Sequence, residues 1–291
     1  MEYYNANSYF KDRFGSKVYK AAVSLDVTCP NRDGSKGTGG CIFCSEGGSG
    51  EFSANSKSVT DSINEAIERV SRKTSGATRY IAYFQSFTNT YCAPDYLRRS
   101  IDEAMNHPDV CAVSIATRPD CLPDGILSVL DEYNRRKPIF VELGLQTIHE
   151  DTANWIRRGY RTGEYDEAVR KLKKIGINVI THVIFGLKDE TEEMMLDTVR
   201  YACDKGTDGI KFTCLYVLKG TDLEEQYRAR DIKALEMEEY FDIVAKALEI
   251  LPSNVVVHRL TGDGPKKLLI APEWTANKRN VVNYINRRFG N

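Results

Sequence analysis

The sequence predicts an α/β fold, a partial (β/α)6 barrel of the TIM type with a C-terminal extension. Apolar runs rich in β-branched residues recur at intervals of roughly 30–45 residues, and each interval holds one helical pattern, as parallel βαβ units require. No linker rich in Pro, Gly or Ser interrupts this series. A barrel over residues 1–250 with an appended segment, residues 251–291, is therefore preferred to two separate domains.

The expected strands and helices alternate along the chain. Each apolar run is expected to be a buried strand, and each helical pattern places its apolar residues on one face. The six expected barrel strands are Tyr19–Val27, Tyr80–Phe84, Val110–Ala116, Ile139–Leu145, Asn178–Phe185 and Ile210–Val217. The helices expected after them are Ser58–Val70, Tyr96–Met105, Pro123–Tyr133, Tyr165–Ile175, Glu192–Cys203 and Glu236–Ile250. A seventh run, Val255–His258, is assigned to the C-terminal extension.

Composition and charge narrow the class of protein. Hydrophobic residues make up 42% of the chain and charged residues 28%, as in globular proteins with a sizeable core. No stretch approaches the roughly 18 apolar residues of a membrane helix, and the first residues lack the apolar segment of a signal peptide. We therefore expect a cytoplasmic protein with no membrane partner. Lys and Arg number 40 against 41 Asp and Glu, which disfavours a generally basic nucleic-acid binder but leaves room for a local basic patch.

Polar side chains share one parity on successive strands. A closed eight-stranded barrel fills its lumen with Val, Ile and Leu, so this pattern indicates an open lumen that receives a polar ligand. The alternative is that some of these side chains face the helices. The residues concerned are Ser24, Asp26, Tyr83, Gln85, Glu142, Gln146, His182, Lys211 and Thr213.

Three cysteines lie in an unusually long loop after the first strand. Cys29, Cys41 and Cys44 form a C-x11-C-x2-C arrangement in a glycine-rich segment, and thiolates are the ligands of iron–sulfur cubanes and of zinc. A structural zinc site needs a fourth ligand, and no fourth Cys or His lies nearby in the sequence. Three thiolates on a four-iron cluster leave one iron open, and Phe43 would shield the cluster from water. We favour a [4Fe–4S] cluster; zinc with a distant His, or cysteines without metal, are the alternatives.

The arrangement resembles the radical S-adenosylmethionine (SAM) superfamily, which carries three cysteines after the first strand of a (β/α)6 barrel. The longer first gap resembles the catalytic subunit of Elongator and short bacterial proteins of the YhcC/MnmL type. The resemblance extends over about residues 15–285 and includes YFQSFTNTY, TRPDCLPD, ELGLQT, RRGY, THVIFGLKDET, IKFTCLYVLKGT and RLTGDGPKKLLIAPEW. It implies a [4Fe–4S] cluster and SAM as cofactors, cleavage of SAM to a 5′-deoxyadenosyl radical, and an electron donor of the flavodoxin or ferredoxin type.

The resemblance also implies roles for individual residues. Cys29, Cys41 and Cys44 are the implied cluster ligands. Phe84, Gln85 and Ser86 occupy the place of the Gly-Gly-Glu segment that meets the methionyl amino group of SAM, although neither glycine is present.

Further SAM contacts are implied around the fourth and fifth strands. Gln146 and Arg158 match a Gln and an Arg that contact SAM in the coproporphyrinogen dehydrogenase branch. His182 stands where that branch has a SAM-binding Asp. Ala116 stands where related proteins carry a ribose-binding Glu, so Thr117 or Glu142 is the candidate substitute.

Two features favour tRNA as the substrate. One is the similarity to the Elongator subunit, which modifies the wobble uridine side chain. The other is local basic charge with aromatic residues, which suits a phosphate backbone and an unstacked base; the plainer interpretation is a solvated helix face. Residues 157–174 are rich in Arg and Lys, and residues 264–291 hold Lys266, Lys267, Lys278, Arg279, Arg287 and Arg288 with Trp274 and Tyr284 available for stacking.

The predicted reaction is modification of the C5 side chain of wobble uridine. Glu142 and Lys211 are the candidate catalytic residues, and with His182 they are expected to hold a zwitterionic side chain, Lys211 pairing with its carboxylate. An alternative is an anaerobic radical SAM oxidoreductase acting on a tetrapyrrole or another small metabolite. A non-enzymatic Fe–S electron-transfer module is disfavoured because electron carriers generally use four protein thiolates.

Overall fold

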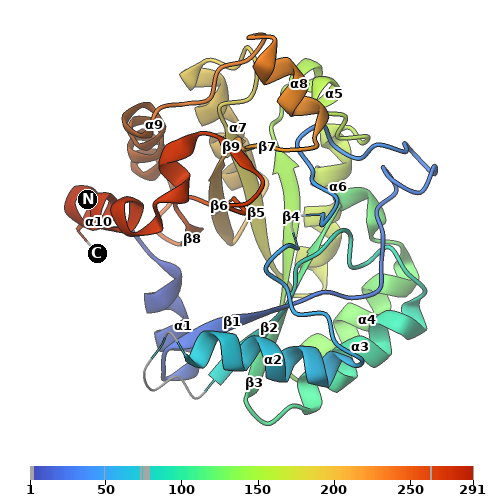
Figure 1. Ribbon diagram of the computed structural model, residues 1–291. Coiled ribbons are helices and arrows are strands. Elements are labelled where there is room, and N and C mark those ends of the chain that lie inside the picture. The colour runs from blue at the N-terminus through green and yellow to red at the C-terminus, as the bar shows by residue number, and fades with distance from the viewer. Residues whose placement is uncertain (1–2, 49, 73, 75–78, 263, 291) are drawn as a thin grey trace.

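The computed structural model describes residues 3–48, 50–72, 74, 79–262 and 264–290. Asp263 of the tail motif, residues 1 and 2 of the expected barrel segment and residue 291 of the expected extension lie outside the described residues. Within that part of the chain, seven parallel strands form one curled sheet in the order β1-β2-β3-β4-β5-β6-β8, with helices on its outer side (Figure 1). This confirms the predicted α/β partial barrel.

The strands and helices alternate along the chain as predicted. The strands are β1 Val18–Val23, β2 Arg79–Phe84, β3 Val110–Thr117, β4 Ile139–Gln146, β5 Asn178–Phe185, β6 Gly209–Cys214, β7 Val217–Leu218, β8 Val256–Arg259 and β9 Leu269–Ala271. The helices are α1 Ala6–Phe14, α2 Val59–Ser71, α3 Pro94–Asn106, α4 Asp124–Asn134, α5 Glu150–Trp155, α6 Thr162–Lys174, α7 Glu192–Asp204, α8 Asp222–Arg228, α9 Met237–Ile250 and α10 Lys278–Phe289. Two short 3₁₀ helices span Pro119–Cys121 and Glu273–Ala276.

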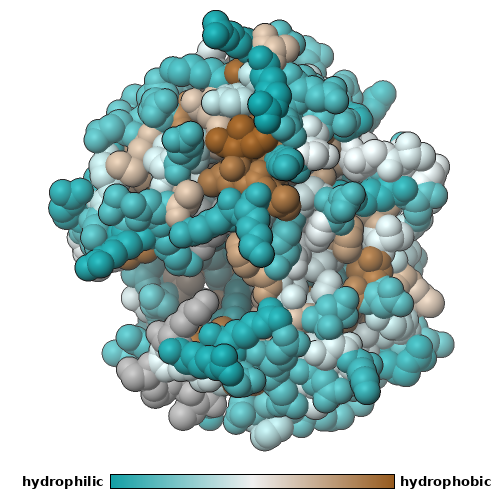
Figure 2. Space-filling model, in the orientation of Figure 1, coloured by the Kyte–Doolittle hydropathy of each residue, from teal (hydrophilic) through white to brown (hydrophobic). Residues whose placement is uncertain are grey.

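The barrel wall has one strand more than the six expected. β8, which the sequence assigned to the C-terminal extension, pairs in parallel with β6 through Gly209 and Val256 and through Ile210 and Val257. The apolar residues of β8 are buried against the sheet. The C-terminal extension therefore contributes a strand to the barrel wall as well as packing on it. β1 and β8 are the two edges of the sheet, and Figure 2 shows the surface hollowed on this open side, between β8 and α2.

Helix α1 closes the bottom of the barrel. Its Phe10 is buried against apolar lumen residues, among them Ile81, Phe140 and Ile180. Asn5, which caps the helix by accepting a hydrogen bond from the Ser8 amide, also forms a β-bridge with Val257 on the free edge of β8. A ligand is therefore expected at the other end, where the carboxyl ends of the strands lie, as in other α/β barrels.

The two aromatic residues expected to stack on RNA are partly buried and pack against the hydrophobic core. The Trp274 ring centroid is 5.8 Å from that of Phe241, and its indole N–H donates to the Leu235 carbonyl at 2.9 Å. The Tyr284 ring is 5.0 Å from the same phenylalanine. Both rings therefore contact the core on one side, and base stacking by these two residues stays a prediction. In the described part of the chain, no helix is long and apolar enough to span a membrane.

Candidate functional site

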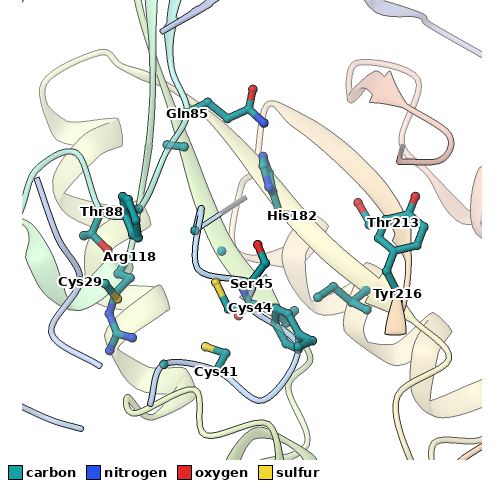
Figure 3. A pocket seen from close by; sticks show the side chains of 18 of the residues that line it. Cys29, Cys41, Cys44, Ser45, Gln85, Thr88, Arg118, His182, Thr213 and Tyr216 are labelled. Carbon is teal, nitrogen blue, oxygen red and sulfur yellow. The ribbon is translucent and has the colours of Figure 1, made fainter. Parts of the chain in front are cut away.

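A cavity of about 410 Å³ opens at the carboxyl ends of the strands. It brings together the three cysteines of the β1–α2 loop with residues of β2, β4, β5 and β6, and Figure 3 shows Cys29, Cys41 and Cys44 facing its space with Gln85, His182 and Thr213 on its other walls. The predicted site residues that line it are Cys29, Cys41, Cys44, Gln85, Thr117, Glu142, Gln146, Arg158 and His182. Phe84, Ser86 and Lys211 are not among its lining residues.

The cysteine loop is fixed to the chain that follows β4. Asn31, only 3% exposed, donates from its side-chain amide to the carbonyls of Arg157 and Arg158 at 2.7 and 3.1 Å. Gly159 makes this approach feasible, because a Cβ there would lie 2.4 Å from the Asn31 amide oxygen. The Ile42 amide adds a hydrogen bond to the Ile156 carbonyl at 3.2 Å. Asn31 is thus a positioning residue that the sequence analysis missed.

The three thiols suit an iron–sulfur cluster. All three cysteines are free, and the Asn31 amide lies 3.7 Å from the Cys41 sulfur, as a donor to a bound thiolate would. Burial and the neighbouring thiols raise the pKa of Cys41 to about 12, so binding of a cluster must displace protons. No group of three or more His, Cys, Asp or Glu side chains in the described residues is arranged to hold a single metal ion. The donor set fits a cubane, whose ligands bind different irons.

The chain turns sharply at the end of β4. Gln146 adopts a positive φ of 62° and accepts a hydrogen bond from the Tyr160 hydroxyl at 3.1 Å. Gly144 leaves room for this side chain, because a Cβ there would lie 2.3 Å from the Gln146 amide nitrogen. This turn aims the Gln146 side chain at the cavity.

Arg158 holds that turn in place. Its guanidinium, on a residue 1% exposed, donates to the carbonyls of Leu145 and Thr147 and of Tyr160, and to the Thr162 hydroxyl. These bonds use most of its donors and fix the guanidinium beside the cavity, which Arg158 also lines; its contact with SAM stays a prediction.

The segment after β2 contributes one side chain to the cavity. Phe84 is fully buried in the outer hydrophobic core. The Ser86 hydroxyl is buried without a hydrogen-bond partner, and Gly50 packs so closely that a Cβ would lie 1.8 Å from it. Of the three predicted residues, Gln85 alone therefore lines the cavity.

A charged cluster forms the floor of the cavity. The Glu142 carboxylate, fully buried, accepts from Lys20 and Lys211, from the Ser114 hydroxyl at 2.6 Å and from His182 Nε2 at 2.7 Å. Lys20 was missed by the sequence analysis, although it shares the parity of Ser24 and Asp26. Those two residues follow the last residue of β1 and do not line the cavity.

The charged groups on the cavity floor determine the protonation states of Glu142 and His182. Burial acts to raise the pKa of Glu142, but the charges of Lys20 and Lys211 outweigh it and hold that pKa well below its usual range. Burial and the Lys211 charge lower the pKa of His182 to about 4. At neutral pH the cluster therefore contains an ionised Glu142 and an uncharged His182.

His182 is expected to make the protein less stable in mild acid. Its pKa is about 4 in the folded protein and about 6.5 in an unfolded chain, so the unfolded state binds more protons between these values. The free energy of unfolding should fall by about 2–3 kcal/mol as the pH drops through this window. Urea titrations from pH 7 to pH 4.5 should show a shallower fall for His182→Asn; equal slopes would contradict this account.

Comparisons with known proteins agree with the fold and the cysteine loop. Residues 31–202 match the Radical SAM superfamily, and residues 207–290 match the Radical_SAM C-terminal domain. The chain is 42% identical over 290 residues to YtqA of Bacillus subtilis, covering 99% of this chain and 90% of that protein. It is 32% identical over 267 residues to YhcC of Escherichia coli K12, covering 91% and 85%.

More distant relatives share part of the chain. The tRNA uridine(34) acetyltransferase of Methanocaldococcus jannaschii is 27% identical over 175 residues, which are 59% of this chain and 32% of that protein. The solved structure of Elp3 from Methanocaldococcus infernus superposes with a TM-score of 0.69 at 18% identity, covering 94% of this chain and 63% of that one. The superposition shows a shared fold.

These matches establish which cofactors the protein binds and to which superfamily it belongs. Proteins of this superfamily bind a [4Fe–4S] cluster and SAM, so both cofactor predictions are confirmed, whereas the ligand role of each cysteine stays a prediction. Membership of this enzyme superfamily disfavours the alternative of a non-enzymatic Fe–S electron-transfer module. The chain belongs to the radical SAM superfamily of enzymes, in the Elongator-like group that includes YtqA and YhcC.

Proposed function

We propose that this radical SAM enzyme holds its cluster on Cys29, Cys41 and Cys44 and modifies the C5 side chain of wobble uridine in tRNA. The observation that carries the proposal is one cavity that is lined by the three thiols, by the ionised Glu142 and by His182. When bound, the reduced cluster supplies the electron that cleaves SAM to methionine and the hydrogen-abstracting 5′-deoxyadenosyl radical.

Residues between the thiols and the floor are assigned to SAM. Gln146 and Gln85 line the cavity from β4 and the end of β2, and Thr117 lines it from β3. The Thr117 hydroxyl hydrogen-bonds that of Thr90 at 2.5 Å, which fixes its orientation. Arg158 supports these residues indirectly, because its hydrogen bonds hold the turn that carries Gln146.

The lumen floor is assigned to the substrate. Glu142 and His182 line the cavity, and Lys211 lies behind them in an ion pair with Glu142. This set suits a polar side chain such as a carboxymethylaminomethyl-type substituent of uridine. Removal or remodelling of such a substituent is the reaction we assign. The tRNA itself is supported by the relative that is named as a tRNA uridine(34) acetyltransferase.

Basic residues at the mouth are assigned to the RNA backbone. Lys266 and Lys267 are exposed and directly follow Gly264 and Pro265, which line the cavity. The cluster at residues 157–174 is less available, because Arg157 pairs with Asp222 and other members are paired or buried. We also assign a flavodoxin- or ferredoxin-type electron donor and a cytoplasmic location to the enzyme.

The direct test is a reaction in vitro. Reconstituted enzyme, SAM and dithionite are incubated anaerobically with tRNA, and the nucleosides are measured by mass spectrometry. A mass change confined to wobble uridine, with matching 5′-deoxyadenosine, is expected. If tRNA neither stimulates SAM cleavage nor is itself modified, the tRNA assignment is overturned and the small-metabolite oxidoreductase is favoured.

Replacing Gln146 with alanine is expected to weaken SAM binding about tenfold, because the loss of one hydrogen bond in a desolvated site costs roughly 1–2 kcal/mol. The iron content should not change, since Gln146 does not touch the thiols. Equilibrium binding of SAM to the reconstituted protein checks this. Normal SAM affinity would remove Gln146 from the assigned set.

Replacing Lys266 and Lys267 together with glutamine is expected to flatten the salt dependence of tRNA binding. Each lost single-strand phosphate contact reduces the slope of log K against log salt by about 0.7, so a change of about 1.4 is expected. Lys11 and Lys17, exposed at the opposite end of the barrel, provide the matched control pair. An equal change in both double variants would show a non-specific charge effect.

A further inference from the structure

Four arginines line the cavity, and three of them hydrogen-bond to the protein's own chain. Arg32 donates to two carbonyls of the cysteine loop at 3.1 and 2.5 Å. Arg118 donates to both oxygens of the Asp120 carboxylate at 2.9 Å, and Arg158 donates to carbonyls of the turn after β4. The fourth is Arg259, and in the described part of the chain its guanidinium has no hydrogen-bond or ion-pair partner.

The strand register places Arg259 level with the floor of the cavity. Lys211 of β6 pairs with His182 of β5 on one side and with Arg259 of β8 on the other. Arg259 is the last residue of β8, and it is exposed to water at the edge of the barrel wall. Its charge reaches the floor: burial comes first in lowering the pKa of His182, and the charge of Arg259 adds to that effect.

The Arg259 guanidinium lies on the wall that faces away from the cysteine loop. Gly262 leaves room for it, because a Cβ there would lie 2.2 Å from Arg259 Nη2 and 2.6 Å from the Tyr216 hydroxyl oxygen. The guanidinium and the Tyr216 hydroxyl therefore border the same space. Figure 3 shows Tyr216 and Thr213 across the cavity from Cys29. This is the part of the cavity that is assigned to the substrate.

The acids of the cavity wall are engaged elsewhere. Among the described lining residues the carboxylates are Glu51 and Glu142. Glu51 accepts from the Ser45 hydroxyl within the cysteine loop, and Glu142 already accepts from four side chains. Arg259 thus faces the cavity without a counterion. A guanidinium offers two parallel N–H donors, which match the two oxygens of a carboxylate.

We propose that Arg259 binds the anionic end of the substrate, and that this end is a carboxylate on the uridine side chain. A backbone phosphodiester is tied into the RNA on both sides, whereas a carboxylate at the end of a flexible side chain can reach the level of the floor. Lys266 and Lys267 follow in the same segment and are exposed, so they suit the RNA backbone. Lys211, expected from the sequence to pair with the carboxylate, does not line the cavity. The subsite rests on the proposed function for the identity of the molecule that carries the carboxylate.

The test compares two anticodon stem-loops on reconstituted enzyme saturated with SAM. One carries carboxymethylaminomethyluridine at the wobble position, and the other carries the uncharged amide of the same group. The wild type is expected to bind the first at least about tenfold more tightly, as a charge-assisted hydrogen bond provides. Arg259→Gln should bring the two affinities within about twofold, and Arg259→Lys should keep part of the preference, because an ammonium has the charge without the fork. Arg99→Gln, at an exposed position of α3 outside the cavity lining, should keep all of it.

Failure of the subsite and failure of the tRNA substrate give different results. Equal affinity for acid and amide in the wild type, or a preference that Arg259→Gln keeps, would overturn the subsite and leave the tRNA substrate in place. Weaker SAM binding by Arg259→Gln would also overturn it, by assigning the residue to SAM.

If neither stem-loop binds, the tRNA substrate fails, and small anions test the subsite alone. Propionate, propionamide and inorganic phosphate are added at constant ionic strength, and the melting temperature is measured. Propionate should raise it in the wild type and not in Arg259→Gln. No effect of propionate, or a larger effect of propionamide or phosphate, would overturn the carboxylate subsite.

Discussion

Replacing Cys41 with alanine is expected to abolish the iron–sulfur cluster and, with it, all cleavage of SAM. Three thiolates are the fewest that hold a cubane with one open iron, and two would leave a second iron exposed to solvent. After anaerobic reconstitution the wild type should contain about four irons per chain, and the variant close to none. Iron and sulfide analysis, with the EPR spectrum of the reduced protein before and after SAM, measures this.

Cys203→Ala is the matched control, because Cys203 lies on α7 and packs at the edge of the outer hydrophobic core. It should retain full iron content and SAM cleavage. A Cys41→Ala protein with four irons and a normal spectrum would contradict the ligand assignment, as would wild-type protein that binds stoichiometric zinc and refuses iron.

Replacing Glu142 with leucine is expected to reduce the free energy of unfolding by about 3–5 kcal/mol, the usual cost of removing one partner from a buried ion pair. Lys20 and Lys211, whose ammonium nitrogens both lie 4.6 Å from the centroid of the Tyr83 ring, would then lose the carboxylate that they share. Urea denaturation of the cluster-free protein at pH 7 measures the change. Adding Lys20→Met and Lys211→Met to the variant should restore most of the loss, because the unbalanced charges are then gone. A single variant as stable as the wild type would contradict the described floor.

The regular part of the fold was predictable from local patterns. Strands β2 to β6 follow apolar runs that stand apart from their helices, so periodicity located them within a few residues. β8 was assigned wrongly because it has four residues and no helix of its own after it. Its interval from β6, which holds α9, resembles that of the other βαβ units, so the same pattern also fits β8.

The site was predictable where residue chemistry is distinctive. The spacing of Cys29, Cys41 and Cys44 indicated a cluster, and strand parity brought Glu142 and His182 to one lumen. Lys20 was not predicted although it shares their parity, because a lysine near the start of a strand is also typical of a solvent-facing position. Asn31 and Arg158 act by donating to backbone carbonyls, and such roles depend on where the chain turns rather than on a motif.

The central claim, that the enzyme acts on wobble uridine, is tested most directly in cells. Total tRNA from a strain lacking this gene is digested, and its nucleosides are compared by mass spectrometry with those of the parent strain. We predict that the precursor of one wobble uridine derivative accumulates, and that the wild-type gene restores the parent profile while a Cys41→Ala gene does not. A wobble-uridine profile unchanged by the deletion would contradict the claim.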